Sequence, residues 1–229
     1  MSILKNISVV IPLAPGEKAY LDLLKDLEVL PHETEIILST TEPLAEIFPK
    51  NIHVIHTQKG RAHQLNGGVI KASKDYLWFL HADSRISKKD ISTLEKSLNV
   101  APETLFYFNL KFYSGPIWMV LNTIGVWVRS HFLGIPFGDQ GLCIQKSLFK
   151  SLGGFDEKVP FGEDHLFVWK AKKQGIGLKC TGGWLKTSAR KYQRQGWFKT
   201  TVNHMSLTFK QAFPQYFAIL LRSHKISLI

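Results

Sequence analysis

Short apolar runs alternate with amphipathic runs along the first hundred residues of the chain. The apolar runs, each short enough to be a buried strand, cover residues 7–11, 35–38, 52–55 and 76–80. The amphipathic runs predict helices at residues 17–30, 62–72 and 87–99, and Ser87 with Asp90 three residues later is the expected N-cap of the last one. Such alternation is typical of βαβ units and predicts an α/β fold, with a mainly parallel sheet flanked by helices.

The pattern is less regular after residue 100. It predicts a strand, an aromatic-rich helix, a glycine-rich loop, a helix, a short strand and a final helix, at residues 105–113, 118–132, 134–141, 163–174, 177–181 and 199–213. The loop is of interest because loops carry functional residues more often than regular elements do. The chain has 229 residues, 45% of them hydrophobic, and no repeat or linker divides it. We therefore expect residues 1–229 to form a single domain.

Charge is distributed unevenly along the chain. The formal net charge is +11, from 29 Lys and Arg against 18 Asp and Glu. Residues 1–144 hold 14 of each sign, so residues 145–229, with 15 basic and 4 acidic residues, carry the whole excess. An anionic partner such as a phosphate group, a nucleic acid or a lipid surface is therefore expected for the C-terminal third.

Several classes of protein are disfavoured by what the sequence lacks. The two cysteines, Cys143 and Cys180, form neither a disulfide framework nor a metal-binding spacing, which fits a reducing cytoplasm. The first residues do not have the layout of a signal peptide. The longest apolar stretch, residues 117–128, is interrupted by Asn122 and Thr123 and is too short for a transmembrane helix. We expect a cytoplasmic protein.

The end of the fourth predicted strand is the most informative segment. His81 and Asp83 follow it directly, and ligands bind at this edge of open α/β sheets. Two residues apart on an extended chain, these side chains point the same way, and together they suit a divalent cation bridging a diphosphate. The alternative is that Asp83 and Ser84 only cap the next helix.

Six short motifs in a fixed order decide between these interpretations. They are residues 7–12, Gly60-Arg61-Ala62-His63-Gln64-Leu65-Asn66-Gly67-Gly68, Phe79-Leu80-His81-Ala82-Asp83, Phe137-Gly138-Asp139-Gln140-Gly141, Leu152-Gly153-Gly154-Phe155 and Gly162-Glu163-Asp164. In this order the sequence resembles the small bacterial branch of the family 2 glycosyltransferases over about residues 7–195. The resemblance implies the GT-A fold, with a Rossmann-like nucleotide-binding sheet. It divides the chain into a nucleotide-sugar-binding half (1–100), an acceptor and catalytic half (101–195) and a basic helical segment (196–229).

The resemblance assigns roles to individual residues. It implies that Asp83 binds the metal, Mn²⁺ or Mg²⁺, that Asp164 is the base of an inverting displacement, and that Glu163 assists it or caps the helix. Alternatively, the acid pair only complements the helix macrodipole. Adjacent helical residues differ in direction by about 100°, so only one acid is expected to face the site. Contacts to the nucleotide sugar are implied for Pro12, Arg61, Asn66, His81, Asp83, Arg190 and Arg194.

Other assignments stay open between a functional and a structural role. Arg61 opens a helix, where an anion docks well, but it also fits a solvated position. Asp139 and Gln140 are implied to contact the sugar or the acceptor, unless Asp139 only forms a turn. Arg190, Lys191 and Arg194 are similar to the family's basic segment that closes over the diphosphate, or form a solvated basic face.

The sequence departs from the family at two places. Many relatives have an acidic residue just after the second strand, where this chain has Ser39-Thr40-Thr41-Glu42. His81 stands where many relatives have Asp, which lowers the local negative charge. The base, the sugar and the acceptor are not specified by the sequence.

Aromatic and aliphatic residues near basic groups suggest a contact with an anionic membrane. Core packing is the favoured interpretation for most of them, and with the membrane interpretation a lipid-linked acceptor is expected. The residues are Trp118, Met119, Leu121, Val126, Trp127, Phe132, Phe213, Tyr216, Phe217, Leu220 and Leu221, with Arg129, Lys210 and Arg222 nearby.

The leading hypothesis is a metal-dependent inverting glycosyltransferase that uses a nucleoside-diphosphate sugar and is cytoplasmic or peripheral on the inner face of the cytoplasmic membrane. A nucleotidyltransferase needs a glycine-rich basic signature after the first strand, and residues 12–18 do not provide one. A non-catalytic basic module that binds membrane or nucleic acid is the third alternative. Because no nucleic-acid motif is present, no nucleic acid partner is expected.

Overall fold

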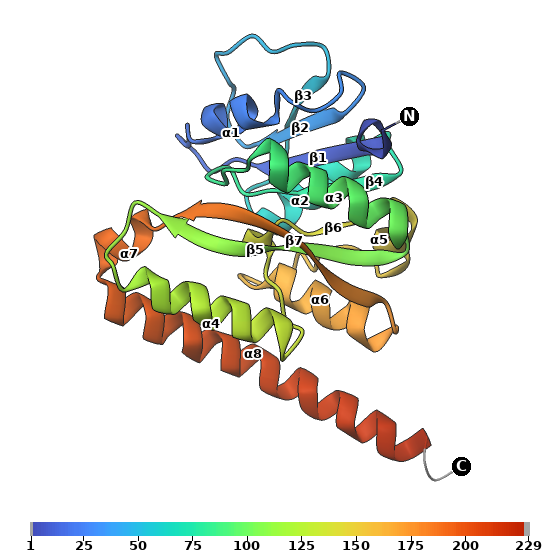
Figure 1. Ribbon diagram of the computed structural model, residues 1–229, viewed down its shortest axis with the longest axis vertical. Coiled ribbons are helices and arrows are strands. Elements are labelled where there is room, and N and C mark those ends of the chain that lie inside the picture. Colours follow the sequence, from blue (N-terminus) through green and yellow to red (C-terminus); the bar gives the residue numbers. More distant parts are fainter. Residues whose placement is uncertain (1, 227–229) are drawn as a thin grey trace.

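The computed structural model describes residues 2–226, and side chains as far as residue 216. Within these residues seven strands form one sheet, in the order β3-β2-β1-β4-β6-β5-β7 (Figure 1). The strands are β1 (Ile7–Pro12), β2 (Glu35–Thr40), β3 (Ile52–His56), β4 (Tyr76–Phe79), β5 (Thr104–Tyr113), β6 (Cys143–Gln145) and β7 (Gly177–Ser188). Only β6 runs antiparallel to its neighbours β4 and β5, so the sheet is mainly parallel. The predicted α/β fold class is confirmed.

Helices cover both faces of this sheet. They are α1 (Tyr20–Leu27), α2 (Arg61–Lys71), α3 (Lys88–Val100), α4 (Met119–His131), α5 (Lys146–Ser151), α6 (Glu163–Lys173), α7 (Arg190–Gln195) and α8 (Trp197–Ile226), with the 3-10 turns η1 (Ile3–Asn6) and η2 (Gly138–Gln140). The predicted cap of α3 is confirmed, since Ser87 Oγ accepts the N–H of Asp90 at 3.3 Å. No helix in the described part of the chain is both long and apolar enough to cross a membrane.

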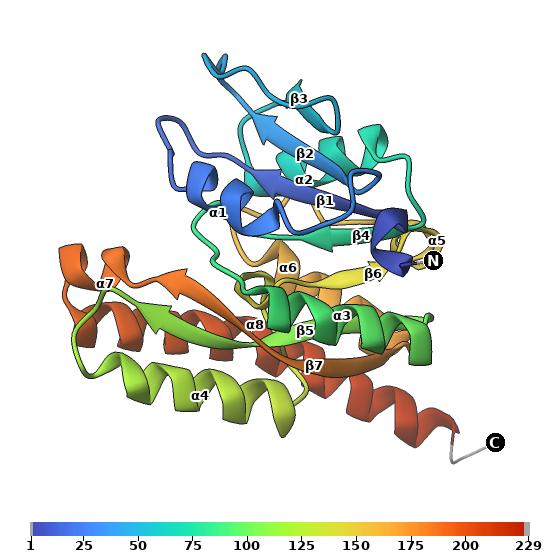
Figure 2. The same ribbon diagram turned by 45° about the horizontal axis from the view of Figure 1, so that its top comes forward.

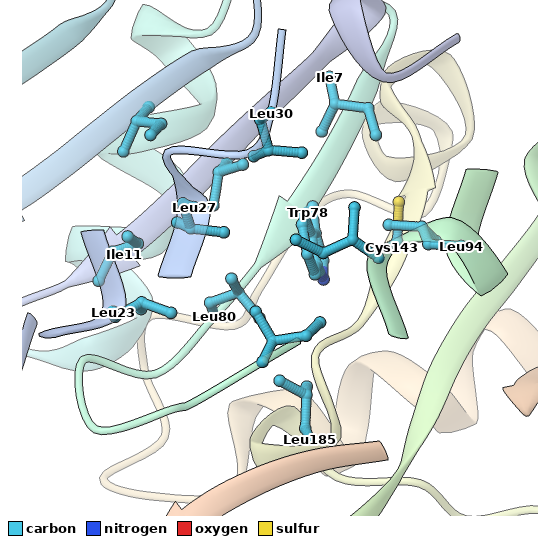
Figure 3. Close-up of a cluster of buried hydrophobic side chains, with 14 of the residues drawn as sticks. Ile7, Ile11, Leu23, Leu27, Leu30, Trp78, Leu80, Leu94, Cys143 and Leu185 are labelled. Carbon is cyan, nitrogen blue, oxygen red and sulfur yellow. The ribbon is translucent and has the colours of Figure 1, made fainter. Parts of the chain in front are cut away.

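Two apolar cores lie on opposite faces of the sheet because side chains alternate along each strand. Val9 and Ile11 of β1 belong to the core under α1 and α3, whereas Val10 packs against α2 and α6. Trp78 is fully buried at the centre of the first core, and its ring stacks on Phe108 with centroids 5.7 Å apart (Figure 3). The sheet is therefore fixed from both sides, and the loops at its carboxyl edge have a rigid base.

Two elements extend beyond their predicted ends. Strand β7 continues to Ser188 instead of ending near residue 181, and α8 continues through Pro214 to Ile226 instead of ending at Phe213. The short elements β6, α5 and α7 and the two 3-10 turns were not predicted. A third apolar cluster joins Met119 of α4 to Ala189 and Tyr192 next to β7.

The prediction that most of the aromatic and aliphatic residues of α4 and α8 pack in the core is wrong. Met119 is buried and Val126 is partly buried against the core, but the others that the structure describes are exposed. The exposed ones are Trp118, Leu121, Trp127, Phe132, Phe213 and Tyr216. The side chains of Phe217, Leu220, Leu221 and Arg222 lie outside the described residues.

Candidate functional site

A cleft of about 360 Å³ lies at the carboxyl edge of the sheet, where β1 and β4 end. Both strands are parallel and paired, so the segments that follow them reach this edge together. Five of the predicted donor-binding residues line the cleft, from four separate parts of the chain. They are Pro12 at the end of β1, Arg61 at the start of α2, His81 and Asp83 after β4, and Arg190 at the start of α7.

Asp83 is half-buried in the wall of the cleft. Burial raises the pKa of its carboxyl above the ordinary value, and the positive charge of Arg190 opposes this. No group of three or more His, Cys, Asp or Glu side chains among the described residues is placed to hold a metal ion. Asp83 therefore fits a cation only as one ligand beside oxygens from a bound diphosphate and water, which is a common arrangement for Mg²⁺.

Arg61 connects the cleft to the acid pair that opens α6. Its Nε donates a hydrogen bond to Glu163, and a terminal nitrogen lies 3.3 Å from Asp164 Oδ1. Both acids are buried, and both face the same guanidinium. Arg61 meets each carboxylate with a different nitrogen, and neither acid is among the residues that line the cleft. That only one of them faces the site therefore stays a prediction.

Asp164 is held as a carboxylate by several donors. Its Oδ2 accepts the N–H of Gly138 at 2.5 Å, and its Oδ1 accepts the N–H of His165 at 2.8 Å. Burial by itself would raise the pKa of this carboxyl, but the charge of Arg61 and the two N–H groups outweigh burial and keep the pKa below the ordinary value. Asp164 is thus ionised at neutral pH, as a proton acceptor must be.

His81 is neutral in this environment. Burial and the nearby Arg61 both lower the pKa of its imidazole, with only Asp164 opposing them. Its Nε2 lies 3.3 Å from a terminal nitrogen of Arg61. Because a guanidinium only donates hydrogen bonds, Nε2 must be the acceptor and the proton must sit on Nδ1.

Arg190 forms an ion pair across the mouth of the cleft with Glu17, a residue from the loop after β1. The hydrogen bond from Arg190 lowers the pKa of Glu17 more than burial raises it. The pair joins residues 173 positions apart in the chain. A bound diphosphate would compete with Glu17 for this guanidinium.

Two predicted donor-binding residues do not reach the cleft. The amide of Asn66 bonds to Phe155 through both its atoms and also donates to Glu157 at 2.8 Å, in a second hollow behind α2. Arg194 is exposed on α7 and does not line the cleft.

The two predicted acceptor-binding residues lie on η2, beside the acid pair. The amide of Gln140 is fully engaged: its oxygen accepts from Arg129 and from the N–H of Phe137, and its nitrogen donates to the Phe108 carbonyl. In contrast, Oδ1 of Asp139 is buried without a hydrogen-bond partner. Burial, opposed by Arg129, raises the pKa of Asp139 to about 6. A carboxyl with this pKa changes its protonation state about one unit below neutral pH.

Several contributors were missed by the sequence analysis. Glu17 was interpreted only as the start of a helix. Arg129, which is half-buried and stacks on the Phe137 ring at 3.4 Å, was interpreted only as a charge near the membrane. Of the stretch after β2, Thr41 lines the cleft, whereas the Thr40 hydroxyl bonds within its own turn. These partners lie far apart in sequence, and no local spacing identifies them.

Comparison with known proteins gives one family match and several structural matches. The model of the family described as glycosyl transferase family 2 matches residues 34–130. This segment contains Arg61, His81 and Asp83 of the cleft, and the recognition made from the six motifs is confirmed. No curated protein matches the chain.

Similar solved structures include three of S. aureus TarS. Each is 17% identical and covers 80% of this chain, with TM-scores of 0.57 for TarS and 0.58 for TarS 1-349, alone and in complex with UDP-GlcNAc. The chain spans 37% of the first of these structures and 60% and 58% of the other two. At this identity the likeness supports the fold, which is of the GT-A glycosyltransferase type.

Proposed function

We propose, from the match of residues 34–130 to the model of glycosyl transferase family 2, that this chain transfers a sugar from a nucleoside-diphosphate sugar to an acceptor hydroxyl with inversion at the anomeric carbon. The observation that carries the proposal is the meeting of Asp83, Arg61 and Arg190 in one cleft at the carboxyl edge of the sheet. Two guanidiniums and a carboxylate suit a diphosphate bound together with a cation.

Three residues of the cleft have a task in this reaction. Arg190 and Arg61 bind oxygens of the donor diphosphate, and Asp83 is the residue that would hold a divalent cation, Mn²⁺ or Mg²⁺. When bound, that cation supplies positive charge that stabilises the leaving diphosphate. The similar structure of S. aureus TarS 1-349 in complex with UDP-GlcNAc supports a nucleotide-sugar donor for this chain.

The transfer itself requires a base on the acceptor side. The acceptor oxygen attacks the anomeric carbon while Asp164 takes its proton, and the bond to the diphosphate oxygen breaks with its electron pair. Glu163 shares Arg61 with Asp164 and so keeps the guanidinium in place. We assign residues 1–100 to donor binding and residues 101–195 to the acceptor and catalysis, because Asp139 and Asp164 both come from the second part. Arg190 is the exception, since it belongs to the second part and lines the donor cleft.

Thermal melting tests donor binding directly. UDP, GDP, dTDP and CDP are each added with and without Mn²⁺ to the wild-type chain, to Asp83→Ala and to the exposed control Asp75→Ala. At least one nucleotide with Mn²⁺ should raise the Tm of the wild type and of the control but not of Asp83→Ala. Absence of every shift, or a shift that survives in Asp83→Ala, contradicts the metal and diphosphate assignment.

Catalysis is tested separately through Asp164. Asp164→Asn should abolish transfer, or hydrolysis of the donor in the absence of an acceptor, while donor affinity measured by calorimetry stays nearly unchanged. Full turnover by this variant would remove Asp164 from the role of base.

A further inference from the structure

Helix α8 exposes a continuous apolar stripe. Its residues are spaced by four, three, four, four and three positions, which places all of them on one face of a helix. They are between 49% and 74% exposed. The stripe consists of Phe198, Val202, Met205, Phe209, Phe213 and Tyr216.

Helix α4 and the residues at its ends add a second stripe beside the first. Its residues, spaced by four, three, four and four positions, are Ile117, Leu121, Ile124, Val128 and Phe132, all exposed. The two helices lie side by side in both views (Figures 1 and 2). Asn122 donates to Thr201 at 3.2 Å and accepts from the Trp197 indole at 2.6 Å. The two stripes therefore belong to one surface, which we call the α4–α8 face.

Two other sides of α8 carry polar residues. One side faces the domain, where His204 contacts Tyr192 and Gln211 contacts His165. Another carries exposed Lys199 and Lys210, spaced like the apolar residues but rotated by about 100° from the centre of the stripe. An apolar face bordered by lysines is the pattern of a helix that lies in the plane of a membrane interface.

The charge of the sequence around the α4–α8 face favours an anionic bilayer over a second copy of the chain as its binding partner. Residues 165–229 contain 12 Lys and Arg and no Asp or Glu, and no acidic residue lies between 104 and 138 either. A second copy of the chain would bring like charges together without acids to pair them. An anionic bilayer offers both the apolar interior and the opposite charge.

We propose that the α4–α8 face binds peripherally to a phospholipid bilayer with anionic headgroups, and that α8 lies in the interface with its apolar stripe below the headgroups. The binding does not depend on the proposed reaction. Where both hold, the membrane bears the acceptor, because the cluster of Met119, Ala189 and Tyr192 packs α4 against α7, which carries Arg190 of the cleft.

Vesicle flotation with the full chain tests the proposal. The vesicles are phosphatidylcholine alone, or an equimolar mixture of phosphatidylcholine and phosphatidylglycerol, at low and high salt. The chain should float with the mixed vesicles at low salt, bind phosphatidylcholine at least about tenfold more weakly, and lose most of its binding at high salt. Equal binding to both compositions, or binding to neither, overturns the proposal.

Two pairs of substitutions separate the apolar and electrostatic parts. Ile124→Ser with Phe209→Ser should weaken partitioning at least about tenfold, and so should Lys199→Glu with Lys210→Glu at low salt. Their matched controls, Ile70→Ser with Val100→Ser and Lys96→Glu with Lys150→Glu, remove similar exposed groups elsewhere and should bind like the wild type.

Two further measurements keep the result unambiguous. Circular dichroism and Tm must show that the variants fold like the wild type, and a folded Ile124→Ser and Phe209→Ser variant that still binds fully overturns the proposal. Sedimentation without vesicles should give a monomer. A dimer that this variant dissociates would identify a second copy of the chain as the occupant instead. Donor binding in the melting assay should stay unchanged in all four double variants, so failure of lipid binding and failure of the proposed function are distinguishable.

Discussion

Replacement of Asp139 by Asn should change how stability depends on pH. Oδ1 of Asp139 is buried without a partner, and burial raises the pKa of the carboxyl from 3.8 to about 6 in the folded chain. Below about pH 3 the group is protonated in both the folded and the unfolded state, so it has no effect on stability there. As the pH rises, the unfolded state releases this proton first, and folding is penalised.

The size of the penalty follows from the shift in pKa. One pKa unit corresponds to about 1.36 kcal/mol, so a difference between 3.8 and about 6 costs about 3 kcal/mol once the pH is above 6. Asp139→Asn removes the ionisation and hence this penalty. Its free energy of unfolding relative to the wild type should therefore rise by about 2.5 kcal/mol between pH 4 and pH 8, because a small part of the penalty is already present at pH 4.

Urea denaturation at several pH values measures this difference, because the pH-independent effect of the substitution cancels in the comparison. Asp75→Asn is the control, since Asp75 is exposed on the opposite edge of β4. The reasoning about Asp139 is refuted if the difference between wild type and Asp139→Asn is flat with pH, or if it falls as the pH rises.

Three other substitutions test the packing, a helix cap and the cleft. Gly68→Ala places a methyl group within 3.0 Å of Val10 Cγ1 and should cost about 1 to 3 kcal/mol in urea unfolding; Gly125→Ala, which meets nothing within 4 Å, should be neutral or stabilising, and the reverse order would contradict this account. Ser87→Ala should lower the unfolding free energy by about 1 kcal/mol through loss of the bond to Asp90, and an unchanged denaturation midpoint would show that the cap is not needed. Arg190→Gln should weaken nucleoside diphosphate binding in calorimetry by about tenfold, whereas Lys191→Gln should not; equal affinities in the two variants would remove Arg190 from the donor site.

The regular part of the fold was predictable because it is encoded locally. Each of the first four strands is a short apolar run, and the helices between them have clear periodicity. Strand β7 was predicted to end at residue 181, just before Gly182 and Gly183. In the structure they occupy an irregularity, where pairing with β5 jumps from Cys180 opposite Tyr107 to Trp184 opposite Asn109. Gly182 has φ of +82°, which glycine adopts without strain.

The end of α8 shows a second way in which a prediction from sequence fails. Pro214 predicts a stop because proline lacks an N–H and clashes with the preceding turn. The helix nevertheless passes through it, and the stripe formed by Phe209, Phe213 and Tyr216 keeps its spacing on both sides. Amphipathic periodicity was the better guide here than the single breaker residue.

The candidate site was predictable as far as its residues belong to recognisable motifs. Asp83, Arg61 and Arg190 do, and they line the cleft. Glu17 does not, because its importance arises only from the opposing Arg190 after folding. The orphaned carboxyl of Asp139 likewise depends on burial, which no local pattern reveals.

The Glu17–Arg190 ion pair also has a consequence for folding during translation, because its two residues are synthesised at different times. During translation, Glu17 and strand β1 leave the ribosome long before Arg190. Domains tend to fold from the N-terminus as they emerge. A nascent chain that has already formed β1, β2 and β4 still has an incomplete cleft, because Arg190 is missing. The cleft is complete only when β7 pairs with β5 and brings Arg190 to its place opposite Glu17. Nucleotide binding should therefore report that the nascent chain has finished folding.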